Sequence, residues 1–178
     1  MAAENIEKFL KSFGDKVLID SLGILDRRKG STELANSLRV TVSEEEKGIY
    51  SVKFYMLDYG TFVDEGVSGN KKERKFTNWK QEKIVSSYKY KKKQPPPDIL
   101  SRWIKKKGIK GRDKKTGRFI SNMSLAFIMG RKIKSQGIQG ISFFQQPFGI
   151  RYEEMKEQFL KEFKKDISTY LTTFTKHK

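Results

Sequence analysis

The segment Leu57-Asp-Tyr-Gly-Thr-Phe-Val-Asp-Glu-Gly-Val67 stands between a run of alternating residues and a long basic segment. Four of its residues recur at i, i+3, i+4 and i+8, the spacing of one face of a helix: Tyr59, Phe62, Val63 and Val67. Gly66 and, just beyond, Gly69 are suited to end such a helix, because glycine accepts the left-handed backbone of helix ends. The segment therefore predicts a short helix held on a sheet by aromatic anchors. Tyr59, Phe62 and Val63 are expected to be structural, not catalytic.

Upstream, the sequence predicts a helix followed by a β-hairpin. Ser31 or Thr32 can cap a short helix that carries Leu34 and Leu38. Apolar and polar residues then alternate in two runs, as in strands with one buried face: Leu38, Val40 and Val42, then Tyr50, Val52, Phe54 and Met56. The polar residues 43–48 between them are expected to form the turn. Helix, hairpin and aromatic helix in this order favour a compact α+β unit.

Long amphipathic helices are predicted near both ends of the chain. The N-terminal one has an apolar face at steps of three and four residues: Ile6, Phe9, Leu10, Phe13 and Val17. The C-terminal one has a longer face: Tyr152, Met155, Phe159, Phe163, Ile167, Tyr170, Leu171 and Phe174. We expect these faces to cover the sheet. A stripe that extends beyond the sheet would instead be an assembly surface, as in many ring-forming proteins.

Two shorter helices are predicted in the middle of the chain. Pro95-Pro-Pro97 forms a stiff extended spacer, after which Asp98 is expected to cap the first helix. Ser121 or Asn122 is expected to start the second. The intervening residues 111–118 predict a flexible basic loop.

The two middle helices end in similar segments, residues 104–111 and 133–140. An internal duplication would explain the likeness. Two helix stops also explain it, with Gly108 and Gly137 in the left-handed position and the isoleucine after each folding back onto the last turn. We favour the two helix stops.

Two separated parts of the sequence carry motifs of one known family. The first runs from Thr32-Glu-Leu-Ala-Asn-Ser-Leu-Arg-Val-Thr-Val42 through the hairpin to Tyr59-x-x-Phe62-Val63-Asp64-x-Gly66. The second is Gly137-Ile-Gln-Gly-Ile-Ser-Phe-Phe144. The first part, over residues 5–67, resembles the tail-completion or neck proteins of tailed bacteriophages, and the second is similar to the late segment of that family. The chain departs from the family between Ser68 and Arg118, where its insertion is longer and more basic.

The resemblance implies a virion structural protein at the head-to-tail junction or upper tail, made in the host cytoplasm. The chain would be one subunit of a six- or twelvefold ring around the DNA conduit, in contact with neighbouring portal, connector or tail proteins. We expect an α+β fold, with a small, mainly antiparallel sheet packed by the long terminal helices. The expected organisation is a single domain, residues 1–178, with a core of 1–67 and 119–178 and a basic extended insertion at 68–118.

The net charge of +17 is concentrated in one part of the chain. Residues 65–118 contain 19 Lys and Arg against five Asp and Glu, so about +14 lies there. Such a field attracts phosphate backbones or acidic protein surfaces. The simplest alternative is a solvated arm that only keeps the protein soluble.

We favour a protein partner for this basic region, contacted outside the conduit or between rings. The expected aromatic anchors are Trp79, Tyr88 and Trp103, and six lysines are expected to contact the partner: Lys91, Lys92, Lys93, Lys105, Lys106 and Lys107. The alternative is a non-specific nucleic-acid-binding accessory protein that uses residues 71–118, with its aromatic rings stacked on bases. Motifs for sequence-specific reading of bases are not evident.

The sequence offers little for catalysis or cofactor binding. The single histidine, His177, lies next to the last residue. Asp58, Asp64 and Glu65, with Lys53, suggest a metal-dependent nuclease, but solvation of the surface is the favoured role for these acids. The chain has no cysteine, so thiolate metal sites and disulfides are not expected. Without a signal sequence or the roughly 18 apolar residues needed to cross a bilayer, a soluble protein without a membrane partner is expected.

Overall fold

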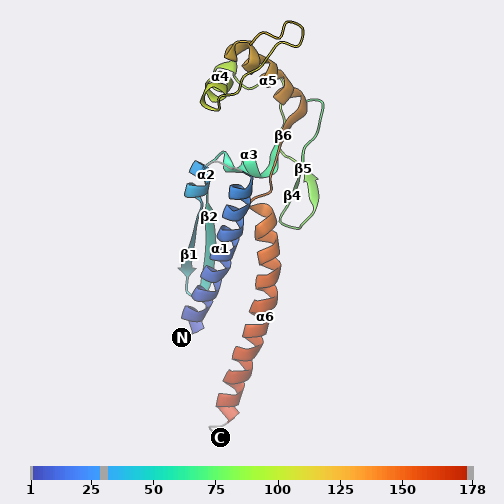
Figure 1. Ribbon diagram of the computed structural model, residues 1–178. Helices are drawn as coiled ribbons and strands as arrows, with labels where there is room; N and C mark the ends of the chain where they lie inside the picture. The colour runs from blue at the N-terminus through green and yellow to red at the C-terminus, as the bar shows by residue number, and fades with distance from the viewer. Residues whose placement is uncertain (1, 29–31, 176–178) are drawn as a thin grey trace. The chain divides into compact units, whose positions relative to one another are not determined.

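The structure, a computed structural model, describes the backbone of residues 2–28 and 32–175 and the side chains of residues 6–28, 33–161 and 164. Figure 1 shows its elements. The helices are α1 (Ala2–Arg27), α2 (Thr32–Ser37), α3 (Gly60–Glu65), α4 (Pro97–Lys106), α5 (Asn122–Gln136) and α6 (Gln145–Thr175). The strands are β1 (Arg39–Glu46), β2 (Ile49–Tyr55), β3 (Gly66–Ser68), β4 (Lys75–Thr77), β5 (Lys83–Val85) and β6 (Gly137–Gln139).

The expected α+β class is confirmed, although the described strands form three two-stranded sheets in place of one: β1–β2, β3–β6 and β4–β5. The chain divides into two compact units. We call Met1–Gly60, Thr77–Glu82 and Phe143–Lys178 the terminal unit, and Thr61–Phe76 with Lys83–Ser142 the central unit. The boundaries of these two units differ from those of the expected core and of the expected inserted arm at 68–118. The expected division stays a prediction.

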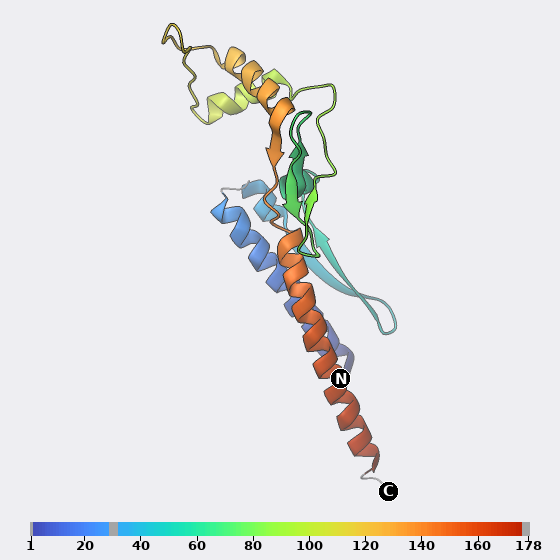
Figure 2. The same ribbon diagram turned by 90° about the vertical axis from the view of Figure 1, so that its right-hand side faces the viewer.

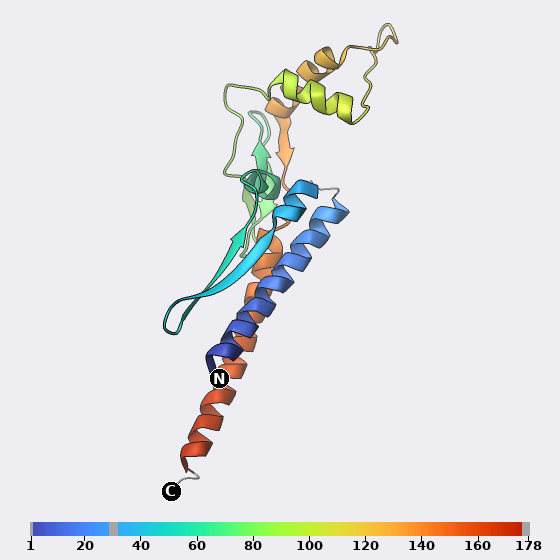
Figure 3. The same cartoon turned by 90° about the vertical axis from the view of Figure 1, so that its left-hand side faces the viewer.

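The terminal unit is built on the antiparallel β1–β2 hairpin, which packs against α1 (Figure 3). Its strands are longer than the alternation indicated, because Ser43 pairs with Ser51 and Glu46 with Ile49. The expected turn at 43–48 is therefore wrong, and only Lys47 and Gly48 lie between the strands. Gly48 has a φ of +83°, the left-handed conformation that a tight hairpin turn favours in glycine.

The core of the terminal unit is aromatic. Phe13 of α1 lies edge-on to Phe54 of β2 and to Phe148 of α6, with ring centroids 6.3 and 6.0 Å apart. Phe144 lies 5.3 Å from Phe54. Contacts between rings of this kind exceed simple area burial by about 0.5–1.5 kcal/mol. The long helices α1 and α6 also contact each other, as Figure 2 and Figure 3 show. Some expected residues have side chains outside the described part of the structure: Ser31, Thr32, Phe163, Ile167, Tyr170, Leu171, Phe174 and His177.

The helix expected at 57–67 is confirmed only in part. It begins at Gly60 and ends at Glu65, and Gly66, with a φ of +77°, stops it as expected. Val67 belongs to β3, which pairs antiparallel with β6 of the central unit (Figure 2). Its backbone hydrogen bonds to a distant segment outweigh the local helical spacing.

The first middle helix, α4, begins at Pro97, so the expected cap by Asp98 is wrong: the proline, which lacks an N–H, occupies the first turn. The helix stops as expected at Gly108, which has a φ of +65°. Ile109 N–H donates to the carbonyl of Ile104 at 3.1 Å and Gly108 N–H donates to that of Lys105 at 3.2 Å. These two bonds are the hydrogen-bond pattern of a left-handed helix end.

The second middle helix, α5, is capped by Ser121, whose hydroxyl accepts the N–H of Ser124 at 3.1 Å, as expected. Gly137 ends it with a φ of +70°, but the expected return of Ile138 onto the last turn is wrong. Ile138 instead enters β6 and is 46% exposed.

Candidate functional site

The two segments that carry the family resemblance pair with each other in the central unit. Ile141 N–H donates to the carbonyl of Val63 at 3.1 Å, and Ser142 N–H donates to that of Asp64 at 3.0 Å. Next to them, β3 and β6 form a short antiparallel ladder. Segments about 75 positions apart thus form one backbone unit, which we call the motif seat (residues 61–68 and 137–142).

The motif seat is so tight that its glycines have no room for a side chain. A Cβ on Gly66 would overlap the backbone of Ile138 and Gly140. A Cβ on Gly137 would overlap the backbone of Val67 and would be strained by the positive φ as well. Glycine is therefore required here by both conformation and space.

The acidic residues of the motif serve structure. Asp64 is 2% exposed, so the expected role in surface solvation is wrong for this residue. One carboxylate oxygen of Glu65 accepts the N–H and the hydroxyl of Ser87, at 3.3 and 2.5 Å. Asp58 belongs to the terminal unit, whereas Asp64 and Glu65 belong to the central unit. In the described ranges, groups of three or more His, Cys, Asp or Glu that could hold a metal ion are absent.

The motif aromatics are less buried than anchors on a sheet would be. Tyr59 is 37% exposed and Phe62 is 44% exposed, so the expected burial of Phe62 is wrong. Val63 is half-buried. The ring of Phe62 contacts the ring of Tyr88 with centroids 4.3 Å apart. This contact brings two of the expected aromatic residues together.

The start of the basic region is ordered against the motif seat. Ser68 N–H donates to the carbonyl of Tyr88 at 2.7 Å, and Tyr90 N–H donates back to the carbonyl of Ser68 at 2.9 Å. The hydroxyl of Ser86 donates to the carbonyl of Gly66 at 2.7 Å. Burial raises the pKa of the Tyr90 phenol. Lys91, Lys92 and Lys93 follow directly and are exposed.

The three expected aromatic anchors lie in different places. Trp79 belongs to the terminal unit, where its ring is edge-on to Tyr152 with centroids 6.1 Å apart. Trp103 lies on α4 of the central unit and is 42% exposed. Tyr88 is half-buried against Phe62. Each anchor thus has its own surroundings, and a single aromatic contact surface stays a prediction.

Helices α4 and α5 form the basic end of the central unit. They contact each other, with Ile104, Ala126 and Gly130 buried. Large apolar side chains on both helices are 42–57% exposed: Ile99, Trp103, Met123, Phe127 and Ile128. Lys105, Lys106 and Lys107 are exposed beside them. Exposed aromatic, Met and Arg side chains are typical of protein–protein interfaces.

The expected flexible loop between α4 and α5 is a small hairpin. Arg112 and Phe119 form a β-bridge, and the carboxylate of Asp113 accepts the N–H groups of Lys115 and Thr116, both at 2.9 Å. These bonds to Asp113 lower the pKa of its carboxyl. The guanidinium of Arg112 lies 4.4 Å from the ring centroid of Phe119. The face of this ring is thus covered by a cation of the same chain.

Charge separates sharply between the two units. The central unit contains 21 Lys and Arg against five Asp and Glu, a net charge of +16. The terminal unit contains 17 against 16, a net charge of +1. Because residues 61–76 and 119–142 join the basic region, nearly the whole charge of the chain resides in one compact unit.

The terminal unit contains an apolar groove of about 520 Å³. It is lined by residues of α1, the β1–β2 hairpin and α6 and by residues next to them, among them Leu10, Val52, Met56, Phe144 and Phe148. Phe148 was not singled out from the sequence, and Phe144 was noted only as the last residue of the second family-like segment. They precede Tyr152 at intervals of four residues, so extending the C-terminal stripe by two steps would have found them.

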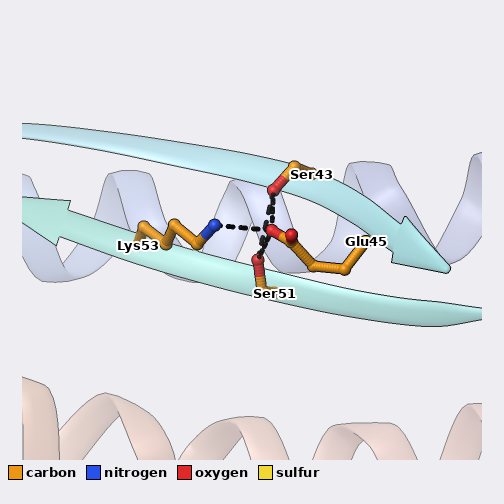
Figure 4. A network of polar contacts seen from close by, with 4 residues as sticks. All are labelled: Ser43, Glu45, Ser51 and Lys53. Carbon is orange, nitrogen blue, oxygen red and sulfur yellow. Dashed lines mark hydrogen bonds and ion pairs between the residues drawn. The ribbon is translucent and has the colours of Figure 1, made fainter.

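A polar network crosses the outer part of the β1–β2 hairpin (Figure 4). One oxygen of Glu45 accepts from the Lys53 ammonium at 2.6 Å and from the hydroxyls of Ser43 and Ser51, each at 2.7 Å. These three bonds lower the pKa of Glu45 to about 2, and the bond from Lys53 has the largest effect. The bond between Glu45 and Lys53 also raises the pKa of Lys53. The network links the two strands across the register Ser43–Ser51.

No family model, curated protein or solved structure matches the chain. The proposal of a function therefore starts from the sequence motifs and the structure. Within residues 2–28 and 32–175, every helix is too short or too polar to cross a membrane.

Proposed function

We propose that the chain is a virion structural protein of a tailed phage, one subunit of a ring at the head-to-tail junction or upper tail. Its task is mechanical: it joins neighbouring rings and leaves the DNA conduit open. Six- and twelvefold rings are the two arrangements that the resemblance implies.

The pairing of the two family-like segments carries this proposal. Tyr59-x-x-Phe62-Val63-Asp64-x-Gly66 and Gly137–Phe144 resemble the family as separate stretches of sequence. Within the central unit, residues 61–66 of the first and 137–142 of the second bond to each other through their backbones. Two chance matches would have no reason to meet in the fold, so their contact supports a shared architecture.

The apolar surface of the terminal unit supports a role in assembly. The groove of about 520 Å³ is open to a partner, and Phe159 and Leu160 of α6 are 43% and 58% exposed. Large exposed apolar patches in soluble proteins mark sites of interaction.

The test is the composition of purified particles of the phage that encodes this chain. Mass spectrometry should detect the chain in stoichiometric amounts, and a reconstruction of the particle should show it as a closed ring between head and tail. Absence of the chain from intact particles would disprove the proposal, whatever the free protein does in solution.

A second candidate function, non-specific binding of nucleic acid, is favoured by the +16 charge of the central unit. It predicts duplex DNA binding that weakens steeply with salt. Replacing Lys105, Lys106 and Lys107 by glutamine would then weaken DNA binding first and particle assembly only secondarily. Our proposal predicts the reverse order. A matched control replaces Lys11, Lys16 and Arg27, three exposed cations of α1 in the terminal unit.

A further inference from the structure

One exposed stripe of α4 combines apolar and basic side chains. Ile99 and Trp103 are 57% and 42% exposed and are separated by one helical turn. Arg102 and Lys106 lie on the same side at helical spacing, and both are exposed. Neither cation has an ion pair within the described residues. We call these four side chains the α4 face.

The end of the β1–β2 hairpin has the opposite character. Glu44, Glu46 and Ile49 are exposed, and Ile49, 56% exposed, is paired with Glu46 across the strands. Glu45 is neutralised by Lys53, whereas Glu44 and Glu46 have no ion pair in the described part of the chain. Gly48 N–H donates to the carboxylate of Glu44 at 2.8 Å and holds it at the turn. We call Glu44, Glu46 and Ile49 the hairpin tip.

We propose that the α4 face of one copy binds the hairpin tip of a second copy. Each surface has an exposed apolar centre, Ile99 with Trp103 or Ile49. Beside the first, the two cations outnumber Asp98, and beside the second, the two carboxylates outnumber Lys47, so the net charges of the two surfaces are opposite. Burying the apolar centres excludes water and strengthens the attraction between the flanking charges. The contact rests on the proposed ring function and deepens it, because it names the joint between neighbouring subunits.

The two surfaces differ, so the contact is head-to-tail. A head-to-tail contact leaves each copy with one free α4 face and one free hairpin tip, and repetition closes a ring when the rotation permits. The central unit, at +16, repels another central unit, whereas the terminal unit at +1 does not. Charge therefore favours contact between unlike units of neighbouring copies.

A protein partner fits the α4 face better than nucleic acid does. Phosphates and sugars would not bury Ile99 or its apolar neighbours on α5. The rings of Phe119 and Phe127 are also covered by Arg112 and Arg131 of the same chain, at 4.4 and 5.1 Å, which competes with base stacking.

The absence of cysteine from the chain allows a direct test. Full-length copies carrying Ile49→Cys are mixed with copies carrying Ile99→Cys at low salt and mildly oxidised. The mixed disulfide should form about tenfold faster than with Ile19→Cys as the partner of Ile99→Cys, a difference of about 1.4 kcal/mol. Ile19 is a suitable control because it is 66% exposed and lies on α1, outside the hairpin tip.

Charge reversal tests the flanking contacts. Glu44→Lys with Glu46→Lys should reduce cross-linking to the control rate, and combining this tip with Arg102→Glu and Lys106→Glu on the other copy should restore it. Asp15→Lys with Asp26→Lys, two exposed acids of α1, should change it little. Circular dichroism of each variant checks that it is folded.

Several results would overturn the inference. Cross-linking at the Ile19 rate, or insensitive to reversal of the tip charges, would do so. Binding of a duplex DNA to the α4 face, without selective cross-linking, would assign that face to nucleic acid. Particles that contain the chain while the Ile49–Ile99 pair fails to cross-link would overturn this contact and leave the ring proposal standing.

Discussion

Replacing Gly66 by alanine is expected to destabilise the central unit by about 3–4 kcal/mol, the sum of two effects. The φ of +77° lies in the left-handed region, where an L-residue with a Cβ is disfavoured by about 1–2 kcal/mol. The new methyl group would also overlap the backbone of Ile138 and Gly140, and backbone atoms cannot move aside as a flexible side chain can.

The second effect has a size that follows from the hydrogen bonds of the motif seat. Relief of the overlap requires the backbone that leads into Gly66 to separate from residues 138–142. This movement would break the backbone hydrogen bonds from Ile141 to Val63 and from Ser142 to Asp64. Each of them contributes about 1 kcal/mol to stability. Added to the conformational effect, their loss gives the expected total.

Gly108→Ala is the matched control. Gly108 also has a positive φ, +65°, in the central unit, but no atom lies within 4 Å of the place that its new methyl group would occupy. It should show only the conformational effect, about 1–2 kcal/mol. The two tryptophans allow the units to be followed separately, since Trp79 is in the terminal unit and Trp103 in the central one. In a Trp79→Phe background, urea unfolding followed by Trp103 fluorescence reports the central unit.

The refuting result is an equal loss of stability in the two variants. If Gly66→Ala is no more destabilising than Gly108→Ala, the family-like segments do not pack together as described. The main structural support for the proposed function would then be lost.

Three further predictions concern single contacts. The Glu45 pKa of about 2 lies below the ordinary 4.5, so its contribution to stability is present above pH 4.5 and lost as the pH falls towards 2; Lys53→Met should raise this pKa in an NMR titration. Phe62→Ala, at a ring 44% exposed, should cost about 2 kcal/mol in urea unfolding, against about 3–5 for Phe143→Ala, at a ring 0% exposed. Ser121→Ala removes the cap of α5 and should cost about 1 kcal/mol.

Each of these has a specific control or contrary outcome. Lys47→Met, next to the same turn, should leave the Glu45 pKa in place, and an equal shift from both lysine variants would contradict the network. A loss at Phe62 as large as that at Phe143 would mean that the ring is buried in solution. Ser121→Asn should keep the stability of α5, since asparagine is an equally good cap.

Local features of this protein were predictable from sequence because neighbouring residues determine them. The alternation of Val40 and Val42 with polar residues located β1, and the opposing run located β2. Gly108 and Ser121 marked a helix end and a helix start, since a left-handed glycine and a capping hydroxyl act within one turn. The predicted ends of elements were wrong where the local pattern did not reach the true end, as at the expected turn 43–48 and the expected cap Asp98.

The sequence motifs of the candidate site could be recognised from the sequence, but the pairing of the two motif segments could not. The motif glycine and the late segment at 137–144 were recognised as separate stretches. Their pairing depends on backbone hydrogen bonds between distant residues, which no local spacing encodes. The same pairing buries Asp64, which local charge patterns had placed on the surface.

The sequence by itself thus determined the α+β class, the order of the helices and of the β1–β2 hairpin, and the presence of a strongly basic region. Tertiary structure alone decided that Val67 joins a strand instead of a helix, and that the charge gathers in one unit at +16. The physical reason is the range of the forces involved. Turns, caps and amphipathic periods act over a few residues, whereas strand pairing and burial select partners from anywhere along the chain.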